Sequence, residues 1–200
     1  PRQILKPLLR PAVSAFGVVS AFDQYNNQDS VSEHVQSVFG DVSSSRALEE
    51  TISAWESWRN PPPPGLSLAE QHLWRQSEAI LRQGQVREGT DLSYGQILAS
   101  LPPGNWNICW MRDMAYAIVA LVEAGHFEEG RSALEFVLKA DSGYYEDYAG
   151  VPYQVTITRY FGRGKEETDF NEDGPNIEFD GFGLFLWSLA TYVDRSGDLT

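Results

Sequence analysis

Three residues in the middle of the chain combine a flat aromatic ring with a pair of opposite charges. Trp110, Arg112 and Asp113 stand at the start of an apolar stretch whose hydrophobic residues recur at helical spacing as far as Gly125. The first turn of a helix leaves backbone N–H groups without partners, which favours Asp113 there and disfavours Arg112. A positive charge placed against the helix dipole, next to a Trp, predicts a polar ligand site. The alternative is an ordinary acidic first turn in which Arg112 pairs with Asp113.

A second polar segment, residues 169–180, carries side chains whose oxygens could bind a cation. Asp169, Asn171 and Asp173 alternate before a glycine, which is the spacing of a calcium loop, and Asp180 stands at the twelfth position. The usual twelfth ligand is a bidentate Glu, and a proline follows the glycine, so the segment departs from an EF-hand. Three interpretations stay open: bound calcium, a solvated acidic loop, and contacts to a sugar.

Charge and composition exclude several classes of partner. The 200 residues include 15 Lys and Arg against 28 Asp and Glu, a net charge of −13 that repels nucleic acids and anionic membranes. The single cysteine, Cys109, excludes an internal disulfide, no Cys/His cluster has zinc-ligand spacing, and no apolar run is long enough to span a bilayer. The six Trp residues offer flat apolar faces with a polar edge, which suit sugars as well as a large core.

Hydrophobic periodicity predicts five helices joined by polar connections. They cover residues 44–58, a segment opened by the capping box Ser67-x-x-Glu70, the stretch from Arg112 to Gly125, and residues 127–139 and 177–193. The last of these is apolar nearly all round, which predicts a helix enclosed on most sides. The capped helix is expected to bury Leu73, Trp74, Ser77, Ile80 and Leu81.

The remaining segments predict connections and a small β element. Residues 84–110 lack helical periodicity and are expected to form a loop that delivers Trp106 and Trp110 to one end of the helices. Alternation over residues 153–159 predicts a strand or hairpin inserted between helices. Residues 1–40 are expected to be a linker or the end of a preceding domain, with an alternating stretch at residues 16–22 that suits a strand edge.

The segment Trp110-Met111-Arg112-Asp113, at the head of an apolar helix, resembles the first active-site motif of the glucoamylases, glycoside hydrolase family 15. The run SYGQILASLPPGNWNICWMRD resembles the family's approach to that motif. The resemblance implies a mostly α fold, with residues 41–200 forming the first, incomplete part of an (α/α)6 barrel. The small β hairpin predicted from the alternation would be an insertion in this barrel, and the resemblance makes residues 1–40 the end of a preceding β-sandwich or its linker.

The resemblance also assigns sugar contacts. In the family the Trp of the motif packs on the terminal sugar, while its Arg and Asp hydrogen-bond the sugar hydroxyls, which implies these roles for Trp110, Arg112 and Asp113. The segment NIEFDGFG resembles a bacterial Gln-x-Asp-x-x-Gly segment that lines the pocket, with Glu178 replacing the Gln and Asp180 matching the Asp. Trp106 stands where the family has a Tyr that reaches the catalytic water, so water positioning or specificity is expected to differ.

The family hydrolyses α-glucosidic bonds at non-reducing ends with inversion, which requires two carboxyl groups. By the resemblance both the acid and the base fall after Thr200, so no catalytic residue is expected within these 200. An oligo- or polysaccharide of the α-glucan type is the expected substrate, with no required cofactor. The alternatives are a non-catalytic barrel like those of kinase regulatory subunits and a calcium-stabilised structural module.

An incomplete ring of helices leaves apolar surface without a partner. We expect it to expose Ile118 and Phe185, and therefore to be covered by the remainder of the barrel or by a second copy in a homodimer.

Overall fold

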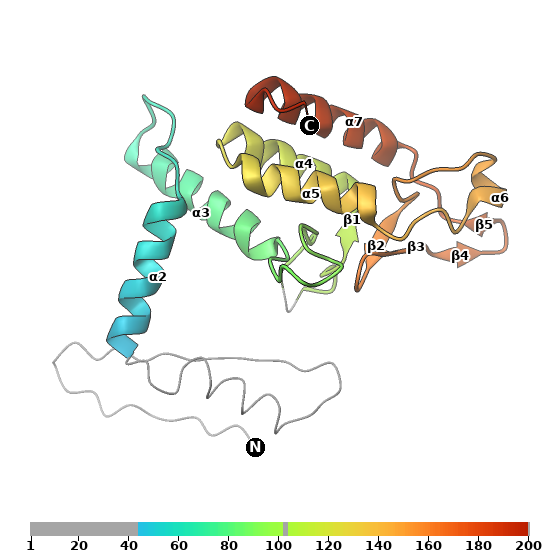
Figure 1. Ribbon diagram of the computed structural model, residues 1–200, viewed down its shortest axis with the longest axis horizontal. Helices are drawn as coiled ribbons and strands as arrows, with labels where there is room; N and C mark the ends of the chain where they lie inside the picture. Colours follow the sequence, from blue (N-terminus) through green and yellow to red (C-terminus); the bar gives the residue numbers. More distant parts are fainter. Residues whose placement is uncertain (1–43, 102–103, 200) are drawn as a thin grey trace, which may run out of the picture. The chain divides into compact units, whose positions relative to one another are not determined.

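The computed structural model describes residues 44–101 and 104–199, and this part of the chain is mostly helical with small antiparallel hairpin sheets (Figure 1). The predictions for residues 1–40 lie outside the described residues. Contacts divide the chain into two units, residues 1–59 and 60–200. In the first, the described residues form α2, Ser44–Trp58, as the periodicity predicts.

The second unit contains the other helices and all of the described strands. The helices are α3 (Leu68–Gly84), α4 (Met111–Glu123), α5 (Phe127–Lys139), α6 (Glu146–Ala149) and α7 (Asp180–Ser196). The strands are β1 (Cys109–Trp110), β2 (Arg159–Phe161), β3 (Lys165–Glu167), β4 (Phe170–Asn171) and β5 (Gly174–Pro175). None of the described helices combines the length and hydrophobicity that crossing a bilayer requires.

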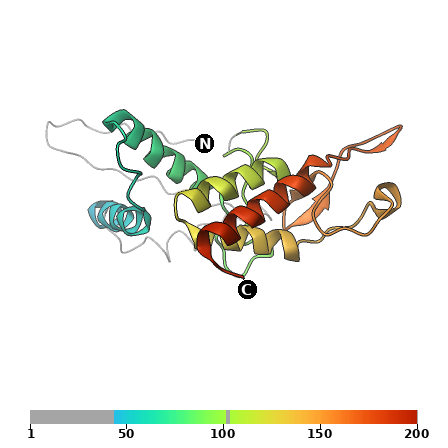
Figure 2. The same ribbon diagram turned by 90° about the horizontal axis from the view of Figure 1, so that it is seen from above.

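Three helices form the core of this unit. Figures 1 and 2 show α4, α5 and α7 side by side, and α4 packs on both of the others. The predicted turn between α4 and α5 is confirmed: Gly125 has φ +81°, its N–H donates to Val122, and the N–H of His126 donates to Leu121. This pair of bonds satisfies carbonyls at the end of α4 and requires a residue that tolerates a left-handed conformation.

The predicted β element begins later than the alternation suggests. β1, β2 and β3 form an antiparallel sheet in which Trp110 is opposite Arg159, and β4 pairs with β5 in a separate hairpin. Residues 153–158 are not part of a strand. Their backbone groups have other partners: the N–H of Ile157 donates to the Glu166 carboxylate and its carbonyl accepts from the N–H of Glu178.

The buried side predicted for α3 is wrong for Leu73, Ser77 and Ile80, which are exposed, whereas Trp74 and Leu81 are half-buried. Leu73 and Ile80 are 63% and 56% exposed, whereas Glu78 is buried. The reason is tertiary: the Glu78 carboxylate lies 2.9 Å from Nε2 of the buried His126, so the side of α3 that carries Glu78 lies against the start of α5. A buried carboxylate needs such a partner, whereas an exposed Leu costs little.

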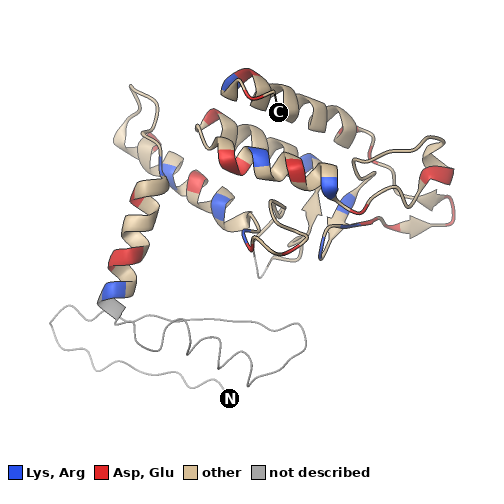
Figure 3. Ribbon diagram, in the orientation of Figure 1, with Lys and Arg blue, Asp and Glu red and all other residues tan. Residues whose placement is uncertain are grey.

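The prediction that Ile118 and Phe185 are exposed is also wrong. Both are buried, because α4 and α7 pack against each other. The apolar surface left open is the opposite side of the same pair, where Tyr116, Leu186 and Trp187 are exposed. α7 is therefore not enclosed on most sides, although it carries no charge between Asp180 and Asp194, as Figure 3 shows.

Gly95 provides a test of the loop that precedes β1. Its φ is +93°, and a Cβ there would overlap the carbonyl oxygen of Ser132 and lie 2.6 Å from its carbonyl carbon. We expect Gly95→Ala to lower the free energy of unfolding by at least about 2 kcal/mol, because strained backbone and a backbone clash add. Gly89→Ala, in the same loop but with open space around it, is the matched control. Equal urea midpoints for the two variants would contradict this packing.

Candidate functional site

A short strand that runs directly into a helix presents the aromatic part of the site. Trp110 ends β1 and caps the N-terminus of α4, so Arg112 and Asp113 follow within the first helical turn. Trp106 packs edge-on against Trp110, with ring centroids 5.5 Å apart. Trp106 is 64% exposed, so its ring is accessible to a ligand.

A hollow of about 430 Å³ gathers the predicted sugar-binding residues. Five of them line it: Trp106, Trp110, Arg112, Asp113 and Glu178. The sixth, Asp180, does not line the hollow but accepts two hydrogen bonds from the guanidinium of Arg112. Ala99, Ser100, Arg159, Asp169 and Asn176 complete it. The structure therefore brings two segments almost seventy positions apart into direct contact beside one polar cavity.

Arg112 is held by carboxylates from the start of α7. Its Nε lies 2.5 Å from Oδ2 of Asp180, its Nη2 lies 3.1 Å from Oδ1, and Nη2 also lies 3.2 Å from Oε2 of Glu178. The alternative in which Arg112 pairs with Asp113 is not the arrangement found. The hydrogen bond to Asp180 raises the pKa of Arg112, and the same bond lowers the pKa of Asp180. Both groups are thus held in their charged forms.

Asp113 differs from the other carboxylates of the hollow. It is exposed at the N-terminal turn of α4 and forms no hydrogen bond or ion pair with another described residue. Because the helix N-terminus favours a negative charge, Asp113 stays an available acceptor. A sugar hydroxyl both accepts and donates hydrogen bonds. Arg112 can donate a hydrogen bond to such a hydroxyl from a fixed position, and Asp113 can accept one from it.

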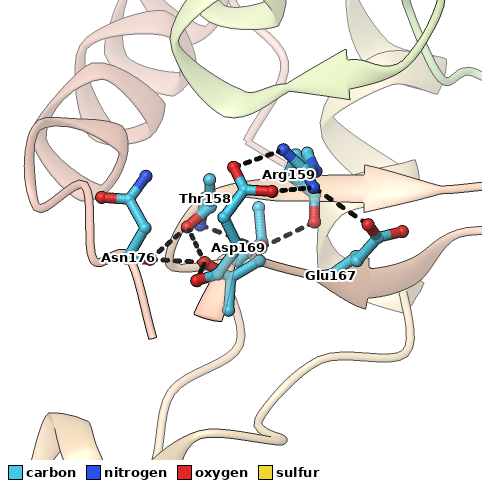
Figure 4. A network of polar contacts seen from close by, with 7 residues as sticks. Thr158, Arg159, Glu167, Asp169 and Asn176 are labelled. Carbon is cyan, nitrogen blue, oxygen red and sulfur yellow. Dashed lines mark hydrogen bonds and ion pairs between the residues drawn. The ribbon is translucent and has the colours of Figure 1, made fainter. Parts of the chain in front are cut away.

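Sequence reasoning missed Arg159. Its guanidinium lies over the Trp110 ring at 5.3 Å, and it bonds both oxygens of Asp169, Nη1 to Oδ2 at 3.0 Å and Nη2 to Oδ1 at 2.8 Å. Nη2 also lies 2.9 Å from Glu167, as Figure 4 shows. The side chain is almost buried, and the bond to Arg159 lowers the pKa of Asp169. An Arg at the end of an otherwise apolar alternating run was the only signal in the sequence.

Two threonines next to β2 and β3 form hydrogen bonds to the segment that precedes α7. The hydroxyls of Thr158 and Thr168 lie 2.9 Å apart, and both donate to the carbonyl of Asn176, at 2.5 and 2.6 Å (Figure 4). Two residues later the N–H of Glu178 donates to Ile157 at 2.7 Å. These bonds position Glu178 and Asp180 opposite Arg112.

A buried carboxylate organises the loop behind them. Glu166, on β3, is 3% exposed and accepts five hydrogen bonds. The donors are the N–H groups of Gly143, Tyr144 and Ile157 and the hydroxyls of Tyr153 and Thr156. Glu166 has no distinguishing signal in the sequence, because it stands in a run of charged residues that is typical of a solvated segment.

The residues predicted for calcium do not form a ligand set in the described part of the chain. There, no three Asp, Glu, His or Cys side chains lie close enough together to hold a metal ion. Asp169 is engaged by Arg159 and Asp180 by Arg112. Asn171 accepts the N–H of Asp173 at 2.8 Å within the β4–β5 turn. The calcium hypothesis stays a prediction.

The sequence matches no family model, no curated protein and no solved structure. The resemblance to glucoamylases therefore rests on the motif Trp110 to Asp113 and on the segments around it.

The role of Glu166 gives a stability prediction. Glu166→Gln replaces one accepting oxygen by an NH2 group that faces buried donors, so we expect it to lower the free energy of unfolding by about 3 kcal/mol. The exposed Glu172→Gln, in the β4–β5 turn, is the control and should change it by less than about 0.5 kcal/mol. Urea denaturation monitored by Trp fluorescence measures both. A Glu166→Gln protein as stable as the control would refute the role of this carboxylate.

The ion pair between Arg112 and Asp180 gives a pH prediction. The pKa of Asp180 is lowered in the folded protein, so its contact with Arg112 is present above the ordinary Asp pKa and is lost as the pH falls through the folded value. We expect an NMR titration to place the pKa of Asp180 below about 3.9, and Arg112→Met to return it toward that value. An Asp180 pKa unaffected by the substitution would mean that the pair does not form.

Proposed function

We propose that the hollow beside Trp110 is the sugar-binding subsite of a glucoamylase-like α-glycosidase. The observation that supports this best is the combination in one cavity of two Trp rings, a guanidinium fixed by two carboxylates, and the available carboxylate of Asp113. Sugars present apolar C–H faces and a rim of hydroxyls, so they need aromatic faces together with fixed donors and acceptors.

In this proposal each residue has a separate task. Trp110, held by the Arg159 guanidinium over its ring, packs against the face of the terminal sugar, and Trp106 covers its edge. Arg112 donates to hydroxyls and Asp113 accepts from them. Glu178 and Asp180 keep Arg112 in place, and Glu178 lines the hollow as a further acceptor.

Asp169, which lines the hollow, and Asp180, which binds Arg112, do not suit the role of general acid. Such a group needs a pKa raised toward the working pH, whereas Arg159 and Arg112 lower the pKa values of Asp169 and Asp180. We place the acid and base that inverting hydrolysis requires after Thr200 on the resemblance alone. The finer fold belongs to the same proposal: α3, α4, α5 and α7 would be helices of an (α/α)6 barrel.

The lowered pKa values of Asp169 and Asp180 also fit a second candidate function, a non-catalytic barrel that binds α-glucans. The two candidates differ in what the full-length protein does to maltose. Hydrolysis that releases the β-anomer of glucose, read by NMR, indicates the enzyme; binding without hydrolysis indicates the regulatory barrel.

Substitution of Arg112 tests the site. We expect Arg112→Ala to weaken binding of maltose at least about tenfold, because charge-assisted hydrogen bonds to the sugar are lost. Arg131→Ala is the control: Arg131 has the same 47% side-chain exposure and also pairs with carboxylates, but on α5, away from the hollow. Isothermal titration calorimetry measures both affinities. Equal affinities in the two variants would overturn the site assignment.

A further inference from the structure

A second, larger cavity adjoins the hollow. Its volume is about 520 Å³, and it lies between α3, residues 97–101 and the first turns of α4. Four residues line both cavities: Ala99, Ser100, Arg112 and Asp113. The two are therefore neighbouring parts of one depression, with the start of α4 as their shared wall.

The two parts differ in chemistry. The hollow carries the charged residues Arg159, Asp169 and Glu178 in addition to the shared pair. The second cavity, which we call the apolar groove, adds only uncharged residues, most of them aliphatic side chains of α3 and of residues 97–101. Its rim is open to solvent, because Ile80 on α3 and Tyr116 on α4 are both exposed.

One polar atom at the junction lacks a partner. Oγ of Ser100 is buried and forms no hydrogen bond to another described residue. A buried hydroxyl without a partner is costly. At the junction, the exposed Arg112 guanidinium and Asp113 carboxylate offer a donor and an acceptor where the polar part of a ligand meets its apolar part.

We infer that the apolar groove binds the aglycone of a glycoside whose sugar lies in the hollow, so that the preferred ligands are glucosides of apolar alcohols. This inference rests on the proposed function. It is favoured over a protein segment as the occupant because the groove is concave, is of the size that small ligands fill, and shares four of its lining residues with the sugar site.

Calorimetry with alkyl α-glucosides of increasing chain length, used below their micelle concentrations, tests the inference. We expect affinity to rise about tenfold or more from methyl to octyl glucoside, because each methylene that enters the groove is removed from water. Ile80→Gln should abolish most of this gain and leave the affinity for methyl glucoside unchanged. Tyr116→Ala, on the opposite wall, should have the same effect.

Leu73→Gln is the matched control, since Leu73 lies on the same helix, is as exposed as Ile80, and lines neither cavity. It should keep the full gain with chain length. A gain that survives both Ile80→Gln and Tyr116→Ala would overturn the inference, because the alkyl chain would then bind elsewhere.

The other outcomes separate this inference from the proposed function. Binding of methyl glucoside that depends on Arg112 but does not tighten with chain length would overturn the groove and leave the sugar site intact. Failure of every glucoside to bind would overturn both. A dimer in sedimentation velocity that Ile80→Gln dissociates would show that a second copy fills the groove, and would overturn the inference in a different way.

Discussion

Glu166 carries a carboxylate that is almost completely removed from water and surrounded by donors. Moving such a group out of water costs several kcal/mol unless its oxygens are hydrogen-bonded, and the five donors around Glu166 come from a single stretch, residues 143–157. That stretch has little regular secondary structure of its own, apart from the short helix α6. The Glu166 side chain on β3 therefore binds both ends of this loop and helps to fix its conformation.

Ile157 connects the hydrogen bonds of Glu166 to the candidate site. Its N–H donates to Glu166 and its carbonyl accepts from Glu178, so the loop that Glu166 orders also fixes the entry to α7. Glu178 and Asp180 then hold Arg112, whose positive charge is unfavourable at the N-terminus of α4 without them. The unfavourable placement of Arg112, visible in the sequence, is explained by carboxylates from a distant segment.

Local sequence patterns predicted most of the helices. They did not predict the features that depend on contacts between residues far apart in the sequence. Hydrophobic periodicity predicts the bounds of α2 and α5. The turn at Gly125 follows from the left-handed conformation that a glycine readily adopts. Periodicity does not predict which face of α3 is buried, because that face is set by the contact of Glu78 with His126. Likewise Arg159 and Glu166 have no local signature: each matters through partners that only the folded chain supplies. The residues of the sugar motif could be predicted because the motif is contiguous in sequence. The contact of Arg112 with the start of α7 is seen only in the folded structure.

The most direct test of a sugar site at Trp110 uses the chain's own six Trp residues as reporters. In a ¹⁵N–¹H NMR spectrum each indole N–H gives one signal, and maltose can be added until the signals stop changing. The account predicts that the signals of Trp106 and Trp110 move together with one dissociation constant, while those of Trp55, Trp58 and Trp74 stay in place. Movement of these three without Trp106 and Trp110, or no movement at saturating maltose, would contradict it.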